Sequence, residues 1–415
     1  MNFRQMMIST IKGESVQTLP FVPRMDLWYK ANKKNGTLPQ QYRNATLVEI
    51  TEDLEIGYHA AVPDFRDYSD ENGDSDLGLG IYRFKTIPYN VILHNVKQKV
   101  VRENGLTTVA YETPYGTIRT KVLYSEEMKR SGATISHVVE HAVKSVKDFD
   151  AAAYIFENAE VCPNYDSYLE YKGTIGDRGL LVAFNSLSAS PYHFIMKELM
   201  NTERFFYESF DYPDELQHFA QRLSFYYEKV FETVVKSPAE VILSGANYDS
   251  SITTPPLFKE FFAPSLKKQA EACHQNGKFL LTHTDGENRG LLEQYPGCGF
   301  DIADSICPAP MTSHTLKQVR QVFDGKITVW GGIPSVSVLE NTMSDVEFEE
   351  YLDMTLENIG KGDHLILSIA DTTPAGAKFA RIRRIAKKAK EFGPVNVGQY
   401  SPKNVGKDKI DISGH

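Results

Sequence analysis

Several polar side chains in the second half of the chain stand at the ends of short apolar runs. They are Asn185 in GLLVAFN, Asn247 in EVILSGAN, His283 and Asp285 in KFLLTHTD, Cys307 in DIADSIC, and Asp371 in HLILSIAD. An imidazole, a thiol and two carboxylates that meet in one place would form a metal site or an acid–base centre. The residue types therefore indicate an enzyme, provided that the fold brings the ends of these runs together.

His283 is the first candidate metal ligand, because imidazole and thiolate groups are the side chains that zinc prefers. Cys307 closes the next apolar run along the chain, so we expect the two side chains to share a coordination sphere. A carboxylate from Asp285, Glu287 or Asp371 would complete three protein ligands and leave a position open for substrate. The alternative is that His283 bonds to a backbone carbonyl and that Cys307 is a small buried hydrophobic residue.

The carboxylates have a structural alternative too, because an Asp before a helix often caps it. Asp371 precedes the last helix, and it is either this cap or a catalytic group. Asp249 is open to the same two interpretations, and its neighbours Asn247 and Tyr248 are candidates to face a ligand. Trp330 either lines a pocket or packs between strands and helices.

Near the N-terminus, Arg24 and Asp26 lie in the stretch PRMDLWYKAN. A guanidinium group held near a site suits a substrate carboxylate or a phosphate, since it forms two parallel hydrogen bonds with either group. The alternative is an Arg–Asp ion pair that closes the bottom of the fold. Both interpretations stay open at the level of the sequence.

The apolar runs themselves predict the fold. Six of them begin near residues 179, 240, 278, 301, 327 and 364. Each run is short, rich in β-branched residues or Leu, and followed by helical periodicity, which is typical of βα units with buried parallel strands. Together with LPFVPRMD and one less regular early strand, they make the eight strands of a (β/α)8 TIM barrel. In such a barrel the carboxyl ends of the strands meet at one mouth, where the active site lies.

Residues 80–125 have a different residue pattern: apolar and polar residues alternate in YNVILHNVKQKVV, LTTVAYE and TIRTKVLY. Turn signals at Glu103-Asn104-Gly105 and Pro114-Tyr115-Gly116 separate these segments, so we predict an antiparallel β-meander inserted into the barrel. The acidic run PDFRDYSDENGDSD is expected to be a surface loop. We divide the chain into an N-terminal segment with the first barrel strand and the meander (1–150), the main part of the barrel (151–400) and a tail (401–415).

Composition excludes several classes of function. The formal net charge of −9 argues against a nucleic-acid partner, which requires a basic surface. No apolar run approaches the roughly 20 residues that cross a bilayer, and the N-terminus lacks the apolar core of a signal peptide. The four cysteines form no CxxC pair, so we expect a cytoplasmic protein without disulfides. There is no phosphate-binding loop, dinucleotide fingerprint or nucleophile elbow.

The order of the segments resembles the uroporphyrinogen decarboxylase superfamily. The resemblance is carried by VILSGANYDSSITTPPLFKEFFAPSLKK, HQNGKFLLTHTDGE, DIADSICPAP, KITVWGGIP and HLILSIADTTP, and it covers roughly residues 180–392. This superfamily contains decarboxylases and zinc-dependent methyltransferases that exchange methyl groups with corrinoid proteins or thiols. The decarboxylase pattern is incomplete here: Arg24 is retained, but a second arginine is absent. The chain looks more like the methyltransferase branch, especially members linked to demethylation of methoxylated compounds.

The resemblance implies a zinc site at which the chain departs from the family pattern. Methyltransferases of this type hold zinc with a His-x-Cys pair and a later Cys. Here the pair is His283-Thr284-Asp285, and Asp371 stands where the later Cys would fall. We therefore expect His283, Asp285 and Cys307 as metal ligands, and a centre that polarises an oxygen atom rather than a thiol.

The same resemblance implies roles for the remaining candidates. Asp249, Glu287 and Asp371 are expected to be catalytic, with Glu287 or Asp249 protonating the leaving oxygen. The expected substrate-binding residues are Arg24, Asp26, Asn185, Asn247, Tyr248 and Trp330. Cobalamin is expected on a separate partner protein, because the chain has no DxHxxG-type cobalamin-binding motif. A homodimer is left open.

Two other functions remain open from the sequence. One is a metal-free decarboxylase in which Arg24 binds a substrate carboxylate and Asp26 or Asp249 donates a proton. The other is a barrel that binds a small ligand or a partner protein without catalysis. Metal content and turnover distinguish the three hypotheses.

Overall fold

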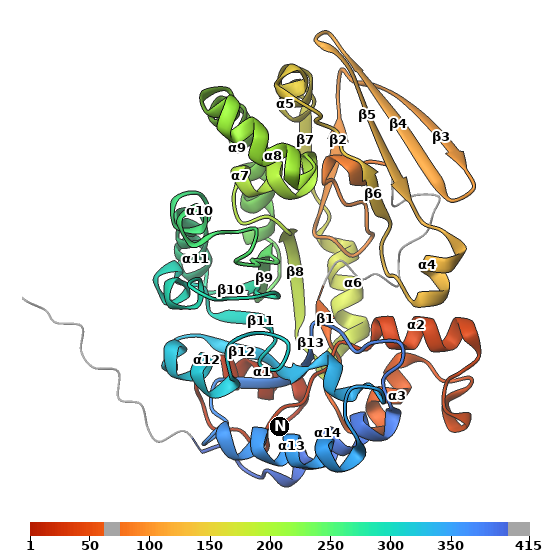
Figure 1. Cartoon of the computed structure of the whole chain (residues 1–415), viewed down its shortest axis with the longest axis vertical. Helices are drawn as coiled ribbons and strands as arrows, with labels where there is room; N and C mark the ends of the chain where they lie inside the picture. The colour runs from red at the N-terminus through yellow and green to blue at the C-terminus, as the bar shows by residue number, and fades with distance from the viewer. Residues whose placement is uncertain (62–74, 397–415) are drawn as a thin grey trace, which may run out of the picture.

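The computed structural model describes residues 1–61 and 75–396, and within these ranges the chain forms an α/β barrel with an inserted antiparallel layer (Figure 1). The expected loop at 63–76 and the tail at 401–415 lie largely or wholly outside the described residues. The parallel sheet has the order β1, β8, β9, β10, β11, β12, β13. Its strands are β1 (Ala60–Ala61), β8 (Leu181–Ser186), β9 (Val241–Ala246), β10 (Phe279–His283), β11 (Ile302–Ile306), β12 (Thr328–Pro334) and β13 (Leu365–Ala370).

A short extended run near the N-terminus supplies the eighth position of the barrel. On one side Val22 N–H donates to the Leu367 carbonyl of β13 at 2.8 Å, and Leu367 N–H donates to the Pro20 carbonyl at 2.8 Å. On the other side Gly57 N–H, just ahead of β1, donates to the Phe21 carbonyl at 2.9 Å. These bonds link the first and last strands of the sheet through residues 20–22. The chain therefore forms the predicted (β/α)8 architecture.

The barrel strands are short apolar segments whose residues are almost all buried, as the continuous runs predicted. Helices between them lie around the sheet and begin at side-chain caps in several cases, such as Thr315 and Ser344, each with a reciprocal capping box. The helices of this part are α1 (Phe3–Ile11), α2 (Asp26–Asn35), α3 (Leu47–Asp53), α6 (Tyr165–Ile175), α9 (Pro213–Val235), α11 (Ala263–Gln275), α12 (Leu316–Phe323), α13 (Asp345–Asn358) and α14 (Phe379–Glu391).

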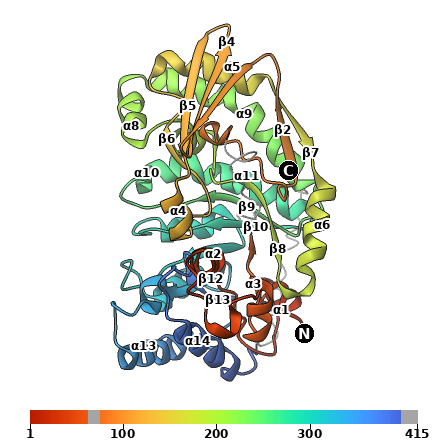
Figure 2. The same cartoon turned by 90° about the vertical axis from the view of Figure 1, so that its right-hand side faces the viewer.

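The inserted layer follows β1 and precedes β8, and it lies at one end of the molecule in both views (Figures 1 and 2). Its four-stranded antiparallel sheet comprises β3 (Lys97–Glu103), β4 (Leu106–Thr113), β5 (Gly116–Leu123) and β6 (His137–Glu140). The turn after β3 contains Asn104 and Gly105 with φ angles of 51° and 78°, as the turn signal predicted. Further pieces of the layer are α4 (Glu126–Ser131), α5 (Phe149–Glu157) and β7 (Ala159–Pro163).

One predicted strand of the meander is two strands in the structure. The segment YNVILHNVKQKVV breaks at Asn95, whose φ of 57° interrupts the extended chain. Its first part is β2 (Tyr89–Leu93), which pairs with β7 rather than with the meander, and only its second part is β3. The prediction of a single strand was wrong, because alternation alone does not reveal a change of pairing partner.

Two of the segments that follow barrel strands contain a π-helix. After β8, α7 (Pro191–Phe194) continues into the π-helix η6 (Ile195–Leu199) and then α8 (Thr202–Asp211); after β9, α10 (Pro255–Leu257) continues into the π-helix η7 (Phe258–Phe262). The two segments pack together through Tyr192 and Phe261, whose stacked ring centroids lie 4.0 Å apart. Both segments follow the carboxyl ends of barrel strands, and π-helical turns are often found near functional sites.

Short 3₁₀ turns complete the described elements: η1 (Gln40–Tyr42), η3 (Leu77–Leu79), η4 (Val146–Asp148), η5 (Gly176–Arg178), η8 (Leu292–Cys298) and η9 (Ser335–Val338). Among the described residues, no helix combines the length and apolar character that a membrane crossing requires.

Candidate functional site

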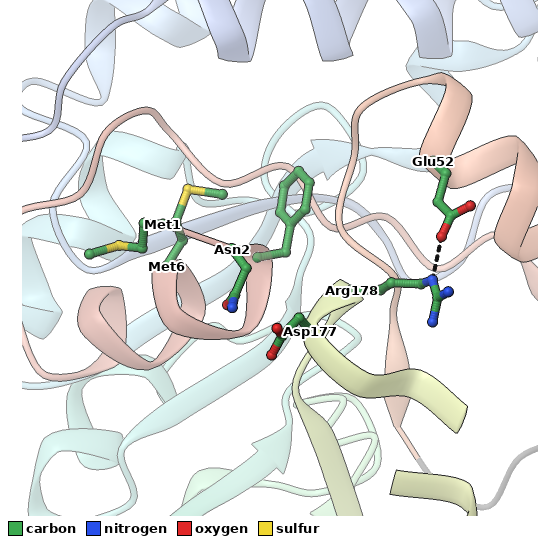
Figure 3. A pocket seen from close by; sticks show the side chains of 7 residues that line it. Met1, Asn2, Met6, Glu52, Asp177 and Arg178 are labelled. Atoms are coloured by element: carbon green, nitrogen blue, oxygen red, sulfur yellow. Dashed lines mark hydrogen bonds and ion pairs between the residues drawn. The ribbon is translucent and has the colours of Figure 1, made fainter. Parts of the chain in front are cut away.

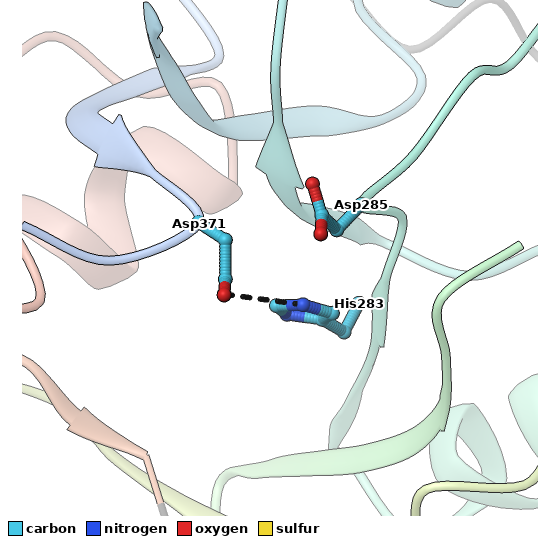
Figure 4. Close-up of side chains that lie close together, drawn as sticks. All are labelled: His283, Asp285 and Asp371. Atoms are coloured by element: carbon cyan, nitrogen blue, oxygen red, sulfur yellow. Dashed lines mark ion pairs between the residues drawn. The ribbon is translucent and has the colours of Figure 1, made fainter. Parts of the chain in front are cut away.

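Three side chains converge at the carboxyl ends of β10 and β13. His283 is the last residue of β10, Asp285 follows it by two residues, and Asp371 comes directly after β13. One potential ligand atom from each residue lies within 4.8 Å of the other two, and Figure 4 shows the side chains facing a common space. The Nε2 atom of His283 lies 3.3 Å from Oδ1 of Asp371. We call these three residues the His283 cluster.

A fourth residue, Asp304 of β11, fixes the orientation of the imidazole. Asp304 is the register partner of His283 in the neighbouring strand, and its Oδ2 lies 2.7 Å from His283 Nδ1. Burial alone would lower the pKa of His283, but the hydrogen bond to Asp304 and the charges of Asp371 and Asp304 raise it overall. With Nδ1–H donated to Asp304, Nε2 faces the two cluster carboxylates. This is the arrangement that carboxylates impose on metal-ligating histidines.

Asp371 is held in the cluster by groups from two other segments. Arg24 Nη1 lies 3.5 Å from Asp371 Oδ1, and Ser305 Oγ donates to the same oxygen at 3.3 Å. Burial would raise the pKa of Asp371, but the charges of His283 and Arg24 outweigh burial and lower it. Burial raises the pKa of Asp285, with only part of this effect offset by His283. The two carboxylates of the cluster therefore differ in their affinity for a proton.

The structure places Arg24 and Asp26 at the mouth, beside the cluster. Arg24 Nε lies 3.2 Å from Asp26 Oδ1, so the guanidinium is shared between Asp26 and Asp371. Asp26 is also the first residue of α2, where a carboxylate is favoured by the helix dipole. The ion pair expected from the sequence is present, but it joins the site rather than the bottom of the barrel.

Cys307 lies close to the cluster without belonging to it. It follows β11, and its Sγ is 3.5 Å from Met311 Sδ. Burial, assisted by the charges of Asp285 and Asp371, raises the pKa of the thiol to about 12, which disfavours the thiolate that binds metal. In the described residues the structure thus brings Asp371, rather than Cys307, together with His283 and Asp285.

Asp249 and Glu287 hold the mouth loops in place. Asp249 accepts hydrogen bonds from the backbone N–H groups of Ser251 at 2.8 Å and Glu287 at 3.1 Å. Glu287 in turn accepts from the backbone N–H groups of Arg289 at 3.0 Å and Ser313 at 2.9 Å. Burial would raise the pKa of both acids, but hydrogen bonds from the hydroxyls of Ser251 and Ser313, together with these backbone bonds, lower it. Both acids therefore stabilise the loops at the mouth. Their lowered pKa disfavours the protonated form that a proton donor needs.

Most of the other expected substrate-binding residues are turned into the core. Tyr248 is fully buried with its hydroxyl 2.7 Å from Thr282 Oγ1, and Trp330 donates its Nε1–H to the Val22 carbonyl at 3.0 Å. Asn185 is buried and donates to Ser244 Oγ at 3.0 Å. Asn247 is exposed, and its backbone N–H donates to the His283 carbonyl at 2.9 Å. These contacts support the packing alternative for Tyr248 and Trp330.

Four residues near the cluster were not among the predicted site residues: Asp304, Ser305, His59 and Lys197. Asp304 and Ser305 lie inside DIADSIC, ahead of the Cys that ends this segment. His59 precedes the two-residue strand β1, and its ring centroid is 4.8 Å from that of Trp330. Burial lowers the pKa of His59, and the negative charge of Asp304 offsets only part of this effect. A polar residue inside an otherwise apolar run was the available signal for all but Lys197, which lies on a helix.

A cavity of about 540 Å³ lies elsewhere, between α1, α3 and the turn before β8 (Figure 3). Its lining includes Met6, Asp177 and Arg178, and Arg178 forms an ion pair with Glu52. Because Asp177 and Arg178 precede β8, this cavity opens at the amino end of the strands, on the side away from the His283 cluster. It contributes nothing to the cluster.

Comparison with known proteins places this barrel in a family. The sequence profile described as "Uroporphyrinogen decarboxylase (URO-D)" matches residues 138–392, which include β8 to β13 and the whole His283 cluster. The chain therefore belongs to the uroporphyrinogen decarboxylase family, as its segments predicted. No curated protein sequence matches the chain.

Among solved structures, a methyltransferase from Methanosarcina mazei has a similar fold. The likeness covers 94% of this chain and 99% of the other, with a TM-score of 0.54 and 12% sequence identity. At this identity the likeness establishes the fold, and the chemistry must be argued from the residues of the site.

Proposed function

We propose that the protein is a zinc-dependent methyltransferase, which moves a methyl group from a small methoxylated or methylated compound to a corrinoid carried by a partner protein. The observation that carries this proposal is the convergence of His283, Asp285 and Asp371 at the mouth of a barrel of this family. The methyltransferase with the same fold supports it further.

The donor set of the cluster suits zinc. Zinc binds imidazole nitrogen and carboxylate oxygen atoms, and a catalytic zinc site has three protein ligands and one open position. His283, Asp285 and Asp371 offer three such donor atoms within 4.8 Å of one another. The second nitrogen of the imidazole is engaged by Asp304, which is the usual companion of a metal-bound histidine. When bound, zinc would supply a Lewis acid that polarises the oxygen of a methyl ether or alcohol.

The residues around the cluster have separable tasks. Asp304 keeps the proton of His283 on Nδ1, so that Nε2 presents its lone pair to the cluster. Arg24 and Ser305 hold Asp371 in position through 3.5 Å and 3.3 Å contacts. Asp249 and Glu287 fix the loops after β9 and β10, and this restricts the space in which a substrate can bind.

The charge of the site disfavours decarboxylation of a polycarboxylate substrate. Asp26, Asp304 and the two cluster carboxylates surround the mouth, and Arg24 is already shared between Asp26 and Asp371. A substrate with many carboxylates would meet repulsion here rather than a free guanidinium. Methyl transfer from a small compound requires no such charge.

The proposal is tested by loading the full chain with zinc and supplying small methoxylated compounds together with cob(I)alamin. Formation of methylcobalamin, followed by absorbance, reports methyl transfer. We expect transfer that depends on zinc and is lost in His283→Ala, while the control His274→Ala, which removes an exposed imidazole paired with Asp301, stays active. Equal activity of metal-free protein, or of His283→Ala, would contradict the proposal.

A further inference from the structure

Strand β11 carries a β-bulge beside the His283 cluster. Between Asp304 and Ile306 the pairing with β12 shifts, so that β11 has one residue more than its neighbour at this point. The extra residue is Ser305, whose φ of 60° lies in the left-handed region. Bulges are rare between parallel strands, and they occur often next to active sites, where they change the direction of a side chain.

The bulge allows two consecutive side chains to reach the cluster. In a regular strand, neighbouring side chains point to opposite faces of the sheet, so Asp304 and Ser305 would diverge. Here Asp304 Oδ2 lies 2.7 Å from Nδ1 of His283. Ser305 Oγ donates to Oδ1 of Asp371 at 3.3 Å, and both side chains of the bulge are almost fully buried. One dipeptide of β11 therefore contacts candidate ligands on two other segments.

The backbone of the bulge also supports the segment that carries the third candidate ligand. Thr284 separates His283 from Asp285 in the chain. Its backbone N–H donates to the carbonyl of Asp304 at 2.8 Å, and its hydroxyl donates to the same carbonyl at 2.9 Å. Thr284 is fully buried, so water does not compete for these bonds. The bulge is therefore hydrogen-bonded to the segment that supplies two of the three candidate ligands.

A glycine in the neighbouring strand makes room for the bulge. A Cβ atom on Gly331 of β12 would lie 2.6 Å from the carbonyl oxygen of Ile306 and 2.8 Å from its backbone nitrogen. Both separations are shorter than van der Waals contact, and both involve backbone atoms that no side-chain rotation can move. The close approach of β11 to β12 at the bulge therefore requires a glycine at this position.

The serine at the bulge does not follow from the backbone conformation. A positive φ brings a Cβ atom too close to the following carbonyl oxygen, whereas glycine adopts this conformation without that cost. Ser305 is therefore strained, and strain of this kind is found mainly at functional sites. Its side chain supplies what glycine and alanine lack, which is a hydrogen-bond donor to Asp371.

We propose that the bulge at Asp304 and Ser305 is the common support of the metal site, and that Ser305 is a positioning residue whose hydroxyl holds Asp371 in the orientation that binds zinc. The inference rests on the proposed function, because it assumes zinc at the His283 cluster. It assigns no substrate contact to Ser305. Loss of the hydroxyl should weaken zinc binding, whereas relief of the strain should change only the stability of the chain.

The test compares Ser305→Gly with Ser305→Ala in the full chain, because both variants lose the hydroxyl and only alanine keeps a Cβ atom. Zinc affinity is measured by competition with a chromophoric chelator, and the melting temperature is measured on zinc-free protein. We expect both variants to lose about tenfold in zinc affinity, as is typical for a group that orients a metal ligand. The melting temperature of Ser305→Gly should exceed that of Ser305→Ala by about 1–2 °C.

A matched control is Asn95, another non-glycine residue with a left-handed φ, which lies between β2 and β3. Asn95→Gly should leave zinc affinity at the wild-type level. Wild-type zinc affinity in either Ser305 variant would overturn the inference, because the hydroxyl is missing from both. A melting temperature of Ser305→Gly below that of Ser305→Ala would show that the backbone is not strained and would overturn it too.

Failure of the proposed function looks different from failure of this inference. In that case the wild type would bind zinc, and the two Ser305 variants would bind it more weakly, but no methyl group would pass to cob(I)alamin. The zinc affinities therefore decide the role of Ser305 without any measurement of methyl transfer.

Discussion

Two pairs of acids at the same mouth have opposite surroundings. Asp249 and Glu287 accept hydrogen bonds from backbone N–H groups of the loops, whereas Asp285 and Asp371 face His283. In the sequence all four are carboxylates just beyond strand ends. An acid whose oxygens accept hydrogen bonds from loop amides stabilises the mouth. An acid that faces an imidazole and a guanidinium is instead available to a metal or a substrate.

The largest effect is expected from removing one of the two carboxylates that face His283. Asp371→Asn should lower kcat/KM for methyl transfer by about 10²- to 10³-fold, because a bound metal contributes several kcal/mol to the reaction. The equivalent change in the other pair, Asp249→Asn, should lower it less than about threefold. Similar losses in both variants would remove the distinction between the two pairs.

An intermediate effect is expected at Asp304, which touches the cluster only through His283. Asp304→Asn should weaken zinc binding by about 10- to 100-fold, as is typical for the carboxylate partner of a metal-bound histidine. Competition with a chromophoric chelator measures this affinity. An unchanged zinc affinity would show that Asp304 does not orient the ligand.

The pH dependence of zinc binding follows from the raised pKa of His283. Below that pKa the imidazole of the zinc-free protein is protonated, so a proton competes with zinc for the Nε2 position. Zinc affinity should be constant above the pKa and fall about tenfold per pH unit below it. In Asp304→Asn the decline should begin at lower pH, because the hydrogen bond that raises the pKa is weakened. A decline at the same pH in both proteins would contradict this assignment.

The smallest effects are expected in the acids that hold the loops. Asp249→Asn and Glu287→Gln should each lower the free energy of unfolding by about 1 kcal/mol, since both side chains are partly exposed and their hydrogen bonds compete with water. Thermal or urea unfolding measures the change. Zinc content should stay at the wild-type level. Loss of zinc in either variant would show that the substituted acid is part of the metal site.

The fold was predictable from the sequence because the strands from β8 to β13 are buried on both faces and read as continuous apolar runs. The first barrel strands were harder to place. The run at residues 20–22 contributes only a few backbone hydrogen bonds, and β1 has two residues, so neither produces a periodic pattern. The break between β2 and β3 at Asn95 was not predictable either, because apolar and polar residues alternate on both sides of it.

The candidate site was predictable where a polar residue ends a run, as His283, Asp285 and Asp371 do. It was not predictable which neighbours would face them. Asp304 lies within a strand, and only the parallel register between β10 and β11 brings it to His283. Cys307 directly follows the same strand, but its thiol is directed toward Met311. Side-chain direction at a strand end depends on local twist and bulges, which residue types do not reveal.

The central claim is that His283, Asp285 and Asp371 hold one zinc ion. Its most direct test is the zinc content of untagged protein after zinc loading and dialysis, measured for the wild type and for His283→Ala, Asp285→Ala, Asp371→Ala and Cys307→Ala. We expect about one zinc per chain in the wild type and in Cys307→Ala, and little or none in the three cluster variants. A wild type without zinc, or retention of zinc in Asp371→Ala together with its loss in Cys307→Ala, would contradict the account.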